Sequence, residues 1–349
     1  MFQMEHNKAP GPDGFLVEFY QVFWNLIKDD LMAFFTDFHK EDLNLYSLNF
    51  GIITLIPKIH EATKIQQYRP ICVLNVSFKI FTKVGTNRLN KVAQSVVSPT
   101  QTAFMPGRNI MEGVVILHET IHELPTKKSD GVIFKIDFEK AYDKVKWPFL
   151  QQTLRMKGFF PKWCRWVEGM VTGGSVGIKV NDDIGPYFQT KRGLRQGDPM
   201  SPILFNIVAD MLALLIKRAK ADGQIRGVIP HFVDDGLSIL QYADDSIIFL
   251  DHDLEQANNL KLLLCAFELL SGLKINFHKS EIFCYGAAKQ WRIFIPTSLD
   301  VMQENTPSDI WGFQCTIDNS LIRNGVKLKN VLRKSYLVGR LSTYLMEAV

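Results

Sequence analysis

Two adjacent carboxylates, Asp244 and Asp245, are the residues of this sequence with the clearest potential for chemistry. They lie between two apolar runs of strand-forming residues, 237–242 and 246–250. These runs predict a β-hairpin with the acids at its tip. Two like charges about 4 Å apart repel each other by about 4 kcal/mol at an effective dielectric of 20. No basic residue within the hairpin relieves this repulsion. The pattern therefore indicates a divalent-metal site, with a solvated acidic turn as the open alternative.

A third acid, Asp137, follows a run of apolar residues, 132–136, that predicts a strand buried on both faces. A carboxylate at the carboxyl end of a strand is well placed to hold a metal over the edge of a sheet. If this strand and the hairpin are neighbours in one sheet, the three acids converge and suit two Mg²⁺ ions, which prefer oxygen ligands. Two such ions can stabilise the attacking and leaving oxygens of an in-line phosphoryl transfer. Asp143 is expected to be a charge on a helix surface or a structural partner.

A second metal pattern, His118-Glu119-Thr120-Ile121-His122, matches the H-E-x-x-H motif of zinc proteases. Two imidazoles on one face of a helix, with Glu119 between them, could bind zinc and activate water. Against this, Pro125 follows almost at once and Glu139 is the only obvious third ligand nearby. The pattern favours two histidines on the solvated face of an ordinary helix, and a zinc hydrolase is the less favoured alternative.

Two loops carry groups that suit a phosphate or nucleotide ligand. Lys58 and Arg69 flank a polar loop and could grip phosphates, with solvated basic residues as the alternative. In the loop 192–199, Gly197 allows the backbone to approach a ligand closely, and Gln196 could contact a base or sugar edge. For this loop alone, the alternative is an ordinary start of the apolar helix that follows.

The elements that must position these groups alternate between helical and strand patterns along the chain. Apolar residues at helical spacing predict one or two helices over 15–38, and helices over 78–97, 110–124, 138–150, 202–218 and 254–270. Strand or hairpin patterns cover 52–56, 132–136, 176–190, 237–250, 274–277 and 280–285. The 78–97 helix is expected to keep its basic residues on its wet side, namely Lys79, Lys83, Arg88 and Lys91. Beyond about residue 286 the pattern weakens, and 326–349 is expected to be helical and basic.

The composition is that of a folded chain with a real core. Its 349 residues suggest about two domains, 46% of them are hydrophobic, and the net charge of +4 is compatible with a polyanionic partner. The five cysteines show no metal-type or disulfide-framework spacing, which favours a reducing compartment, the cytoplasm or nucleus. No signal-peptide pattern opens the chain and no apolar run reaches the length of a membrane span. We therefore expect an intracellular protein without a membrane partner.

A series of short blocks then occurs in one order along the chain. They are Lys8-Ala9-Pro10-Gly11-Pro12-Asp13-Gly14, Ile56-Pro57-Lys58 with Tyr68-Arg69-Pro70-Ile71, residues 137–143, residues 193–202, Tyr242-Ala243-Asp244-Asp245, and residues 272–276 with Lys279-Ser280. Any one block can arise by chance, whereas all of them in this order are specific. Over about residues 1–285, the chain resembles the reverse transcriptases of LINE-type (non-LTR) retrotransposons.

This resemblance implies an α+β fold, a right-hand polymerase with fingers and a palm built on a β-α-β-β-α-β sheet. It also implies an RNA-directed DNA polymerase, in which a primer 3′-hydroxyl attacks the α-phosphorus of a deoxynucleoside triphosphate on an RNA template. The cofactors would be two Mg²⁺ ions, with Mn²⁺ as an alternative. The catalytic and metal-binding residues would be Asp137, Asp244 and Asp245.

By the same resemblance, the substrate-binding residues would be Lys58, Arg69, Tyr142, Gln196, Gly197 and Lys279. Tyr142 would stack under the incoming sugar and clash with a 2′-hydroxyl. Gln196 and Gly197 would line the nucleotide and template pocket, and Lys58 and Arg69 would hold the triphosphate. Lys279 would approach the leaving pyrophosphate, as a proton donor. The RNA template and DNA primer would be held mainly through backbone and 2′-hydroxyl contacts.

The resemblance also divides the chain. Residues 1–285, with a core of about 50–285, would be fingers and palm, and 286–349 would be a degenerate or truncated thumb-like segment. Such elements usually carry an endonuclease domain before this region, so the chain is expected to be a fragment of an element's open reading frame. Because the thumb grips the primer–template duplex, the alternative is a catalytically dead remnant that keeps the fold and binds nucleic acid. The sequence makes no prediction of the oligomeric state.

Overall fold

The chain divides into two compact units, each assembled from two stretches of sequence. The computed structural model describes residues 1–6, 8–181, 183–291 and 302–303. The first unit comprises Met1–Val92 with Lys140–Val208, and the second comprises Ala93–Glu139 with Ala209–Val349. The predicted thumb-like segment, 286–349, lies outside the described residues except for 286–291 and 302–303.

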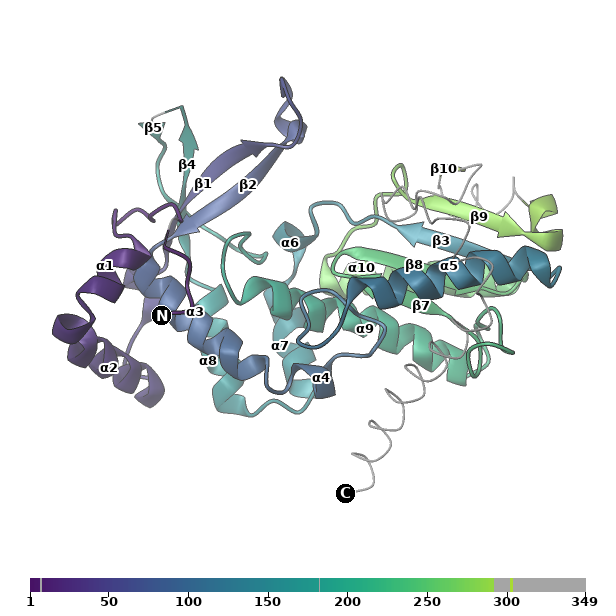
Figure 1. Cartoon of the computed structure of the whole chain (residues 1–349), viewed down its shortest axis with the longest axis horizontal. Coiled ribbons are helices and arrows are strands. Elements are labelled where there is room, and N and C mark those ends of the chain that lie inside the picture. The colour runs from purple at the N-terminus through teal and green to yellow at the C-terminus, as the bar shows by residue number, and fades with distance from the viewer. Residues whose placement is uncertain (7, 182, 292–301, 304–349) are drawn as a thin grey trace, which may run out of the picture. The chain divides into compact units, whose positions relative to one another are not determined.

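The second unit, in its described part, is built on a five-stranded sheet in the order β10-β9-β3-β8-β7 (Figure 1). Its strands are β3 (Gly131–Ile136), β7 (Ile239–Tyr242), β8 (Asp245–Leu250), β9 (Glu281–Tyr285) and β10 (Met302–Gln303). Along the chain, β3, α9 (Ser201–Ala221), β7, β8, α10 (Leu254–Ser271) and β9 follow as β-α-β-β-α-β, with elements of the first unit inserted after β3. Strands β8 and β9 both pair antiparallel with β3. The predicted palm-type sheet and the α+β fold class are confirmed.

Strand β3 is the centre of this sheet because its apolar side chains are buried on both faces. One face belongs to a core cluster shared by the strands and α5 (Ile110–Thr126), which includes Leu117, Leu124, Ile133, Phe249 and Phe283. The neighbouring Val132 and Phe134 are also buried and point to the opposite face, since successive strand side chains alternate. This is the burial that the mainly apolar run predicted, with Lys135 as its one partly buried charged residue. It gives the carboxyl end of β3 a rigid base.

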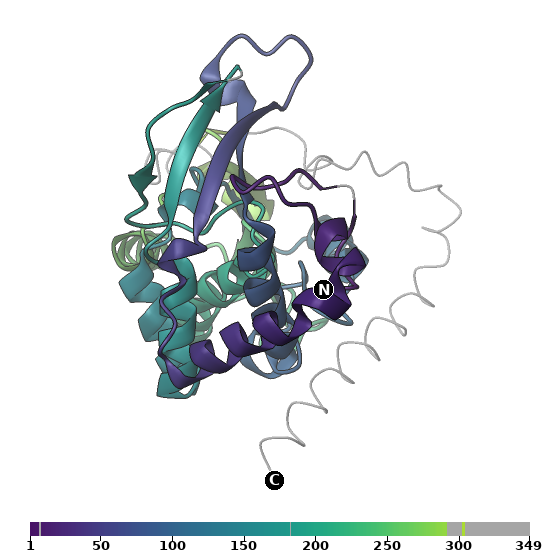
Figure 2. The same ribbon diagram turned by 90° about the vertical axis from the view of Figure 1, so that its left-hand side faces the viewer.

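The first unit contains a second sheet, in the order β2-β1-β4-β5, with β6 also pairing with β4. Its strands are β1 (Phe50–Pro57), β2 (Tyr68–Leu74), β4 (Ser175–Val180), β5 (Asp183–Ile184) and β6 (Phe188–Gln189). Strand β1 pairs antiparallel with β2 and parallel with β4. In Figure 2, β1 and β2 (purple to blue) and β4 (teal) lie side by side above helices of the same unit. The strand predicted over 52–56 and the hairpin predicted over 176–190 are both present.

Helices complete the two units. The first unit holds α1 (Val17–Val22), α2 (Trp24–Lys40), α3 (Val76–Leu89), α6 (Ala141–Lys144), α7 (Trp147–Met156) and α8 (Pro161–Val171), and the second holds the short α4 (Ala93–Val96) besides α5 and α10. Single 3₁₀ turns occur at η1 (Leu45–Ser47) and η2 (Ile65–Gln67), and η3 spans Gly286–Trp291. Within the described residues, no helix combines the length and the apolarity needed to cross a membrane.

The prediction of one continuous helix over 138–150 is wrong. The chain instead forms α6, leaves the helical path at Val145, and starts again as α7. The reason lies far away in sequence, in the loop that follows β6. The backbone N–H of Gly193 donates to the Val145 carbonyl at 2.8 Å, and that of Leu194 donates to the Tyr142 carbonyl at 2.7 Å. These carbonyls therefore serve the loop, whereas a continuous helix would have used them for its own next turn.

The helix predicted over 78–97 is also interrupted, since α3 ends at Leu89 and α4 begins at Ala93. Its basic residues are expected on the solvent-exposed side. This is wrong for Lys79 and Lys83, which are half-buried, and right for Arg88 and Lys91, which are exposed. The cause is that α3 is a central helix whose apolar residues cover more than one face. Burial lowers the pKa of Lys79 below its ordinary value.

Candidate active site

The acids predicted from the sequence lie at one end of the second unit's sheet. Asp137 follows directly after β3, and the turn Ala243-Asp244 joins β7 to β8, whose first residue is Asp245. In the β3–β8 register Ile136 is paired with Ser246, so the next position sets Asp137 opposite Asp245. Residues opposite each other in antiparallel strands have Cα atoms about 5 Å apart. The fold therefore brings together carboxylates that are separated by more than a hundred residues of sequence.

The charges of these acids act on one another. Burial raises the pKa of Asp245 from 3.8 to about 6, and the negative charges of Asp244 and Asp137 add to this rise, with Lys135 opposing it. The pKa of Asp137 is also raised, mainly by burial, and Asp244 contributes to the rise while the Lys279 ammonium opposes it. Lys135 is itself paired with Glu281, at 3.3 Å. Negative charge thus accumulates here with only part of it compensated.

Asp137 is framed by the segment that precedes β9. Its backbone N–H donates to Ser280 Oγ at 3.2 Å, and its carbonyl accepts from the Asn276 backbone N–H at 2.8 Å. The Asn276 side chain also hydrogen-bonds the Asp137 carboxylate, which favours the ionised acid. Lys279, in the same segment, is exposed and is the positive charge with the largest effect on the pKa of Asp137. Lys279 therefore lies near enough to Asp137 to act on its charge.

In the first unit, the loop that carries Gln196 and Gly197 is fastened to strand β2. The Gln196 carbonyl accepts from the Cys72 backbone N–H at 2.7 Å. Gly197 has φ +113°, and a Cβ at this position would come within 2.5 Å of the Cys72 carbonyl oxygen. Only glycine fits this close approach, so the backbone of the loop is held against β2.

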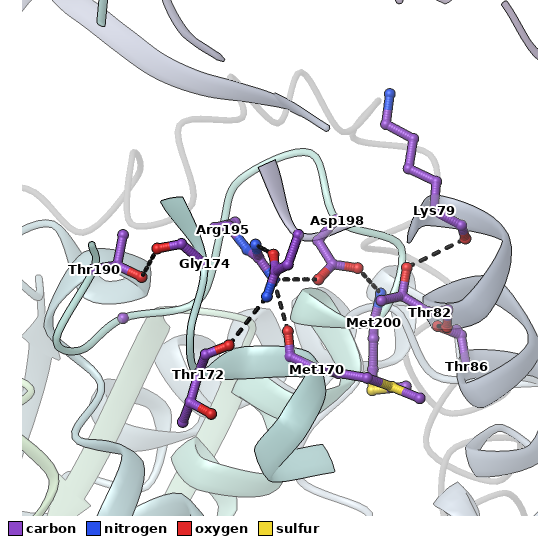
Figure 3. Close-up of polar contacts among 12 residues, drawn as sticks. Lys79, Thr82, Thr86, Met170, Thr172, Gly174, Thr190, Arg195, Asp198 and Met200 are labelled. Carbon is purple, nitrogen blue, oxygen red and sulfur yellow. Dashed lines mark hydrogen bonds and ion pairs between the residues drawn. The ribbon is translucent and has the colours of Figure 1, made fainter. Parts of the chain in front are cut away.

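A buried ion pair stiffens the same loop (Figure 3). The Arg195 guanidinium lies 3.9 Å from the Asp198 carboxylate, and the two side chains are 10% and 4% exposed. Arg195 also donates to the Met170 carbonyl at 2.7 Å and packs over the Phe78 ring, 4.8 Å from its centre. Burial raises the pKa of Asp198, with Arg195 opposing the rise. Asp198 accepts from the Met200 backbone N–H at 3.1 Å, which fixes the start of α9.

Tyr142 belongs to α6 and lies against the same loop through the Leu194-to-Tyr142 backbone hydrogen bond. Its ring is half-buried and stacks on Phe205 of α9, with ring centres 4.6 Å apart and planes within 13°. Tyr142 and the Gln196 loop are therefore neighbours within the first unit. Asp143, next to Tyr142, is half-buried rather than a surface charge, and burial raises its pKa.

Lys58 and Arg69 lie at the same end of the β1–β2 hairpin. Arg69 is paired with Ile56, and the Lys58 backbone N–H donates to the Gln67 carbonyl at 2.8 Å. Both side chains are exposed, and Lys58 Nζ donates to the Gln66 carbonyl at 3.3 Å. The structure thus brings these two basic residues together on a projecting hairpin.

Residues 56–315 match the family described as reverse transcriptase (RNA-dependent DNA polymerase). The chain belongs to the reverse transcriptase family. The predicted resemblance to reverse transcriptases of non-LTR retrotransposons is confirmed as well, because the curated relatives are transposon and retrotransposable-element proteins. Members of this family generally use divalent metals and bind a nucleic-acid template.

Two relatives illustrate the similarity. The chain is 29% identical over 289 residues to the transposon TX1 uncharacterized 149 kDa protein of Xenopus laevis, covering 82% of this chain and 21% of the relative. It is 26% identical over 237 residues to the Pol polyprotein of the type-2 retrotransposable element R2DM of Drosophila melanogaster, covering 67% of this chain and 21% of that polyprotein. This reverse transcriptase chain thus spans about a fifth of the length of these relatives.

Among solved structures, the chain is similar to apo telomerase from Candida tropicalis truncated from its C-terminal domain. The TM-score is 0.52 at 13% sequence identity, covering 69% of this chain and 51% of the telomerase chain. At this identity the likeness shows a shared fold, in agreement with the fingers-and-palm prediction.

The zinc-hydrolase alternative finds no support in this reverse transcriptase. Glu119, which would have to activate water, is buried at 8% exposure, while His122 is exposed. In the part of the chain that the structure describes, no three His, Cys, Asp or Glu side chains are already gathered around a metal position. That statement includes Asp137, Asp244 and Asp245.

Sequence reasoning missed several residues that frame the candidate site. Asn276 and Ser280 stood in a matched block but received no role, although both hydrogen-bond Asp137. The Arg195–Asp198 pair stood in another block and was overlooked in the same way. The signal was present, since polar residues directly beside a catalytic block are candidates to orient it.

Proposed function

We propose that this chain is an RNA-directed DNA polymerase domain that adds deoxynucleotides to a primer 3′-hydroxyl on an RNA template. The observation that carries the proposal is the juxtaposition of Asp137, after the central strand, with Asp244 and Asp245 at the adjacent hairpin. Family membership supports the reaction class. The whole relatives are several times longer, so the activity is proposed for this domain and not inferred from their full length.

The donor set at this sheet end fits two Mg²⁺ ions, with Mn²⁺ as an alternative, held by Asp137, Asp244 and Asp245. The fit is chemical, because the acids are hard oxygen donors, and burial together with the negative charges of Asp244 and Asp137 raises the pKa of Asp245 to about 6. A cation there would remove that penalty. When bound, such ions stabilise the attacking and leaving oxygens of an in-line phosphoryl transfer.

Lys279 is the second-unit residue proposed to meet the leaving group. Its ammonium is exposed and close enough to affect the pKa of Asp137. A mobile cation at the edge of the acidic cluster can attract the pyrophosphate oxygens and donate a proton to them. Asn276 and Ser280 would keep Asp137 oriented while this happens.

The first-unit residues are proposed to select and hold the nucleotide. Tyr142, fixed by its stack on Phe205, would lie under the sugar and exclude a 2′-hydroxyl. The Gln196–Gly197 backbone, held against Cys72, would line the nucleotide and template pocket. Lys58 and Arg69, exposed on the hairpin, would bind the triphosphate as charged donors.

The test is primer extension on an RNA template by the purified chain, with and without Mg²⁺. We expect Mg²⁺-dependent synthesis that Asp244→Asn lowers by about 1,000-fold, since the ligand set supplies several kcal/mol of transition-state stabilisation. Asp222→Asn is the matched control, because Asp222 lies in the same unit in a surface ion pair with Arg218 and should extend like the unmodified chain. Equal loss in both variants would contradict the assignment of Asp244.

The same assay separates the polymerase from a non-catalytic remnant. A chain that binds an RNA–DNA duplex in a filter or fluorescence assay, yet extends no primer with either Mg²⁺ or Mn²⁺, would be the remnant. Extension with Mn²⁺ alone would still support the polymerase, with a changed metal preference.

A further inference from the structure

The turn that carries Asp244 has an unusual backbone. Ala243 adopts φ +53°, in the left-handed region that residues with a Cβ rarely occupy. Tyr242 is paired with Asp245, so Ala243 and Asp244 are the two central residues of a tight hairpin turn, which requires positive φ at the first of them. The Ala243 side chain is buried, at 5% exposure. Because the carbonyl of Ala243 forms the peptide bond to Asp244, the plane of this peptide determines where the Asp244 side chain points.

One side chain holds that residue from both sides. The Ala243 backbone N–H donates to Gln101 Oε1 at 2.8 Å, and Gln101 Nε2 donates to the Ala243 carbonyl at 3.2 Å. Gln101 is fully buried, at 0% exposure. A glutamine amide offers one acceptor and one donor and so can satisfy both groups at once.

The segment around Gln101 is tied to β7 by its backbone. The Gln241 N–H donates to the Thr100 carbonyl at 2.9 Å, and the Thr102 N–H donates to the Gln241 carbonyl at 3.1 Å. Residues 100–102 thus run parallel to β7 at the position just before the turn. On the other side, Gln241 Nε2 donates to the Ala209 carbonyl of α9 at 3.1 Å.

Arg108 fixes this segment in turn. Its guanidinium donates to the Ser98 carbonyl at 2.6 Å and to the Gln101 carbonyl at 2.7 Å. Ser98 is held further by its N–H, which donates to the Asp210 carboxylate of α9 at 2.8 Å. Hydrogen bonds from Arg108 to Gln101, and between Gln101 and Ala243, therefore link the acidic turn to the segment that α9 holds at Ser98. All of these residues belong to the second unit.

We propose that Gln101 is a positioning residue that keeps the Ala243–Asp244 peptide in the orientation needed for Asp244 and Asp245 to act together. The proposal rests on the polymerase function proposed above. Without Gln101, Ala243 loses both of these hydrogen bonds, and a turn that holds a residue with a Cβ at positive φ loses part of its support. The acids remain in the chain but lose their common alignment.

The test compares Gln101→Ala with Gln256→Ala. Gln256 is a matched control, since it is a buried glutamine of the same unit that accepts from the Arg226 N–H at 2.6 Å and donates to Asp253 at 3.3 Å. We expect both variants to lose similar thermal stability, whereas Gln101→Ala alone lowers kcat by about 10- to 100-fold with little change in the KM for nucleotide. Its half-saturating Mg²⁺ concentration should also rise by about tenfold.

A double variant tests whether Gln101 acts through the backbone conformation of Ala243. Glycine adopts positive φ without strain, so Gln101→Ala combined with Ala243→Gly should recover part of the lost kcat, at least about threefold. Equal kcat for the single and double variants would overturn the proposal. An equal fall of kcat in Gln101→Ala and Gln256→Ala would overturn it as well, because a general loss of packing would then explain both.

Amide hydrogen exchange distinguishes this proposal from the proposed function. In the chain without nucleic acid, Gln101→Ala should speed exchange of the Ala243 amide by at least about tenfold, and Gln256→Ala should not. If the unmodified chain extends no primer, the proposed function fails, and this exchange measurement together with the Mg²⁺-induced shift in Tm still decides the role of Gln101. Unchanged exchange at Ala243 would overturn that role.

Discussion

The sheets of the two units differ in how deeply their central strands are buried, and the charged residues follow this difference. Strand β3 of the second unit is almost entirely buried, whereas β1 of the first unit is half-buried along most of its length and exposed at its end. Asp137 follows the buried strand, whereas Lys58 follows β1 and Arg69 lies in β2, paired with Ile56. Under the proposed function, the groups that must hold a fixed geometry lie on the rigid frame, while those proposed to meet a charged ligand from solvent lie on a projecting hairpin.

Matched phenylalanines in the two sheets test this contrast most strongly. Phe249 of β8 is fully buried, while Phe50 of β1 is half-buried against Tyr46 and Tyr187. We expect Phe249→Ala to lower the free energy of unfolding by about 3–5 kcal/mol, because it leaves a cavity in the core. Phe50→Ala should cost less than about 2 kcal/mol, since its ring buries less area. Urea denaturation measures both, and similar losses would contradict the contrast.

Gly197→Ala tests the loop that the first unit holds against β2. Positive φ and the close approach to the Cys72 carbonyl should together lower stability by about 3 kcal/mol or more and raise the KM for nucleotide. Gly158→Ala is the control, since Gly158 has φ +83° with nothing within 4 Å of an added Cβ, and should cost only about 1–2 kcal/mol. Urea denaturation and steady-state kinetics compare the two, and an equal cost would show that the loop can move away from Cys72.

Lys58→Ala and Arg69→Ala should weaken nucleotide binding and leave the free energy of unfolding almost unchanged. Each removes an exposed charge-assisted donor, so the KM for nucleotide is expected to rise by about tenfold or more. The free energy of unfolding should change by less than about 0.5 kcal/mol, because substitutions of exposed side chains usually have little effect on folding stability. Steady-state kinetics measures the KM, and urea denaturation measures the free energy of unfolding. An unchanged KM in both variants would contradict a role of these residues in triphosphate binding.

Asp245→Asn should give the smallest effect, an increase in the Tm of the metal-free chain by a few degrees. The pKa of Asp245 lies at about 6 in the folded chain against an ordinary value of 3.8, so the folded state binds this proton more tightly. Stability from this group therefore falls as pH rises from about 4 to about 6 and stays lost above that. Asparagine cannot ionise, so the advantage of the variant should appear near pH 7 and vanish near pH 4.

Thermal unfolding in EDTA at the two pH values measures this effect. Mg²⁺ should raise the Tm of the unmodified chain at pH 7 and raise that of the variant less. A variant that is less stable than the unmodified chain at pH 7 would contradict the view that the negative charge of the acids is only partly compensated without metal.

Much of the site was accessible from sequence because its signals are local. The apolar run before Asp137 and the paired runs around Asp244 and Asp245 require only burial and a short turn, and both formed as predicted. The 138–150 helix failed because its carbonyls at Tyr142 and Val145 bond a loop about fifty residues away. Lys79 was misplaced for a similar reason, since the face that α3 buries depends on its neighbours.

By itself, the sequence determined the central buried strand, the acidic hairpin and the family, because burial, short turns and ordered motifs are written in adjacent residues. Only the tertiary structure decided that β3 and β8 are paired in the register that sets Asp137 opposite Asp245. It alone also assigned partners to Gln101 and Arg195, whose hydrogen bonds reach Ala243, 142 residues away, and Met170. The physical reason is that a polar side chain finds its partner through the packing of the whole unit, which no local pattern of apolar residues specifies.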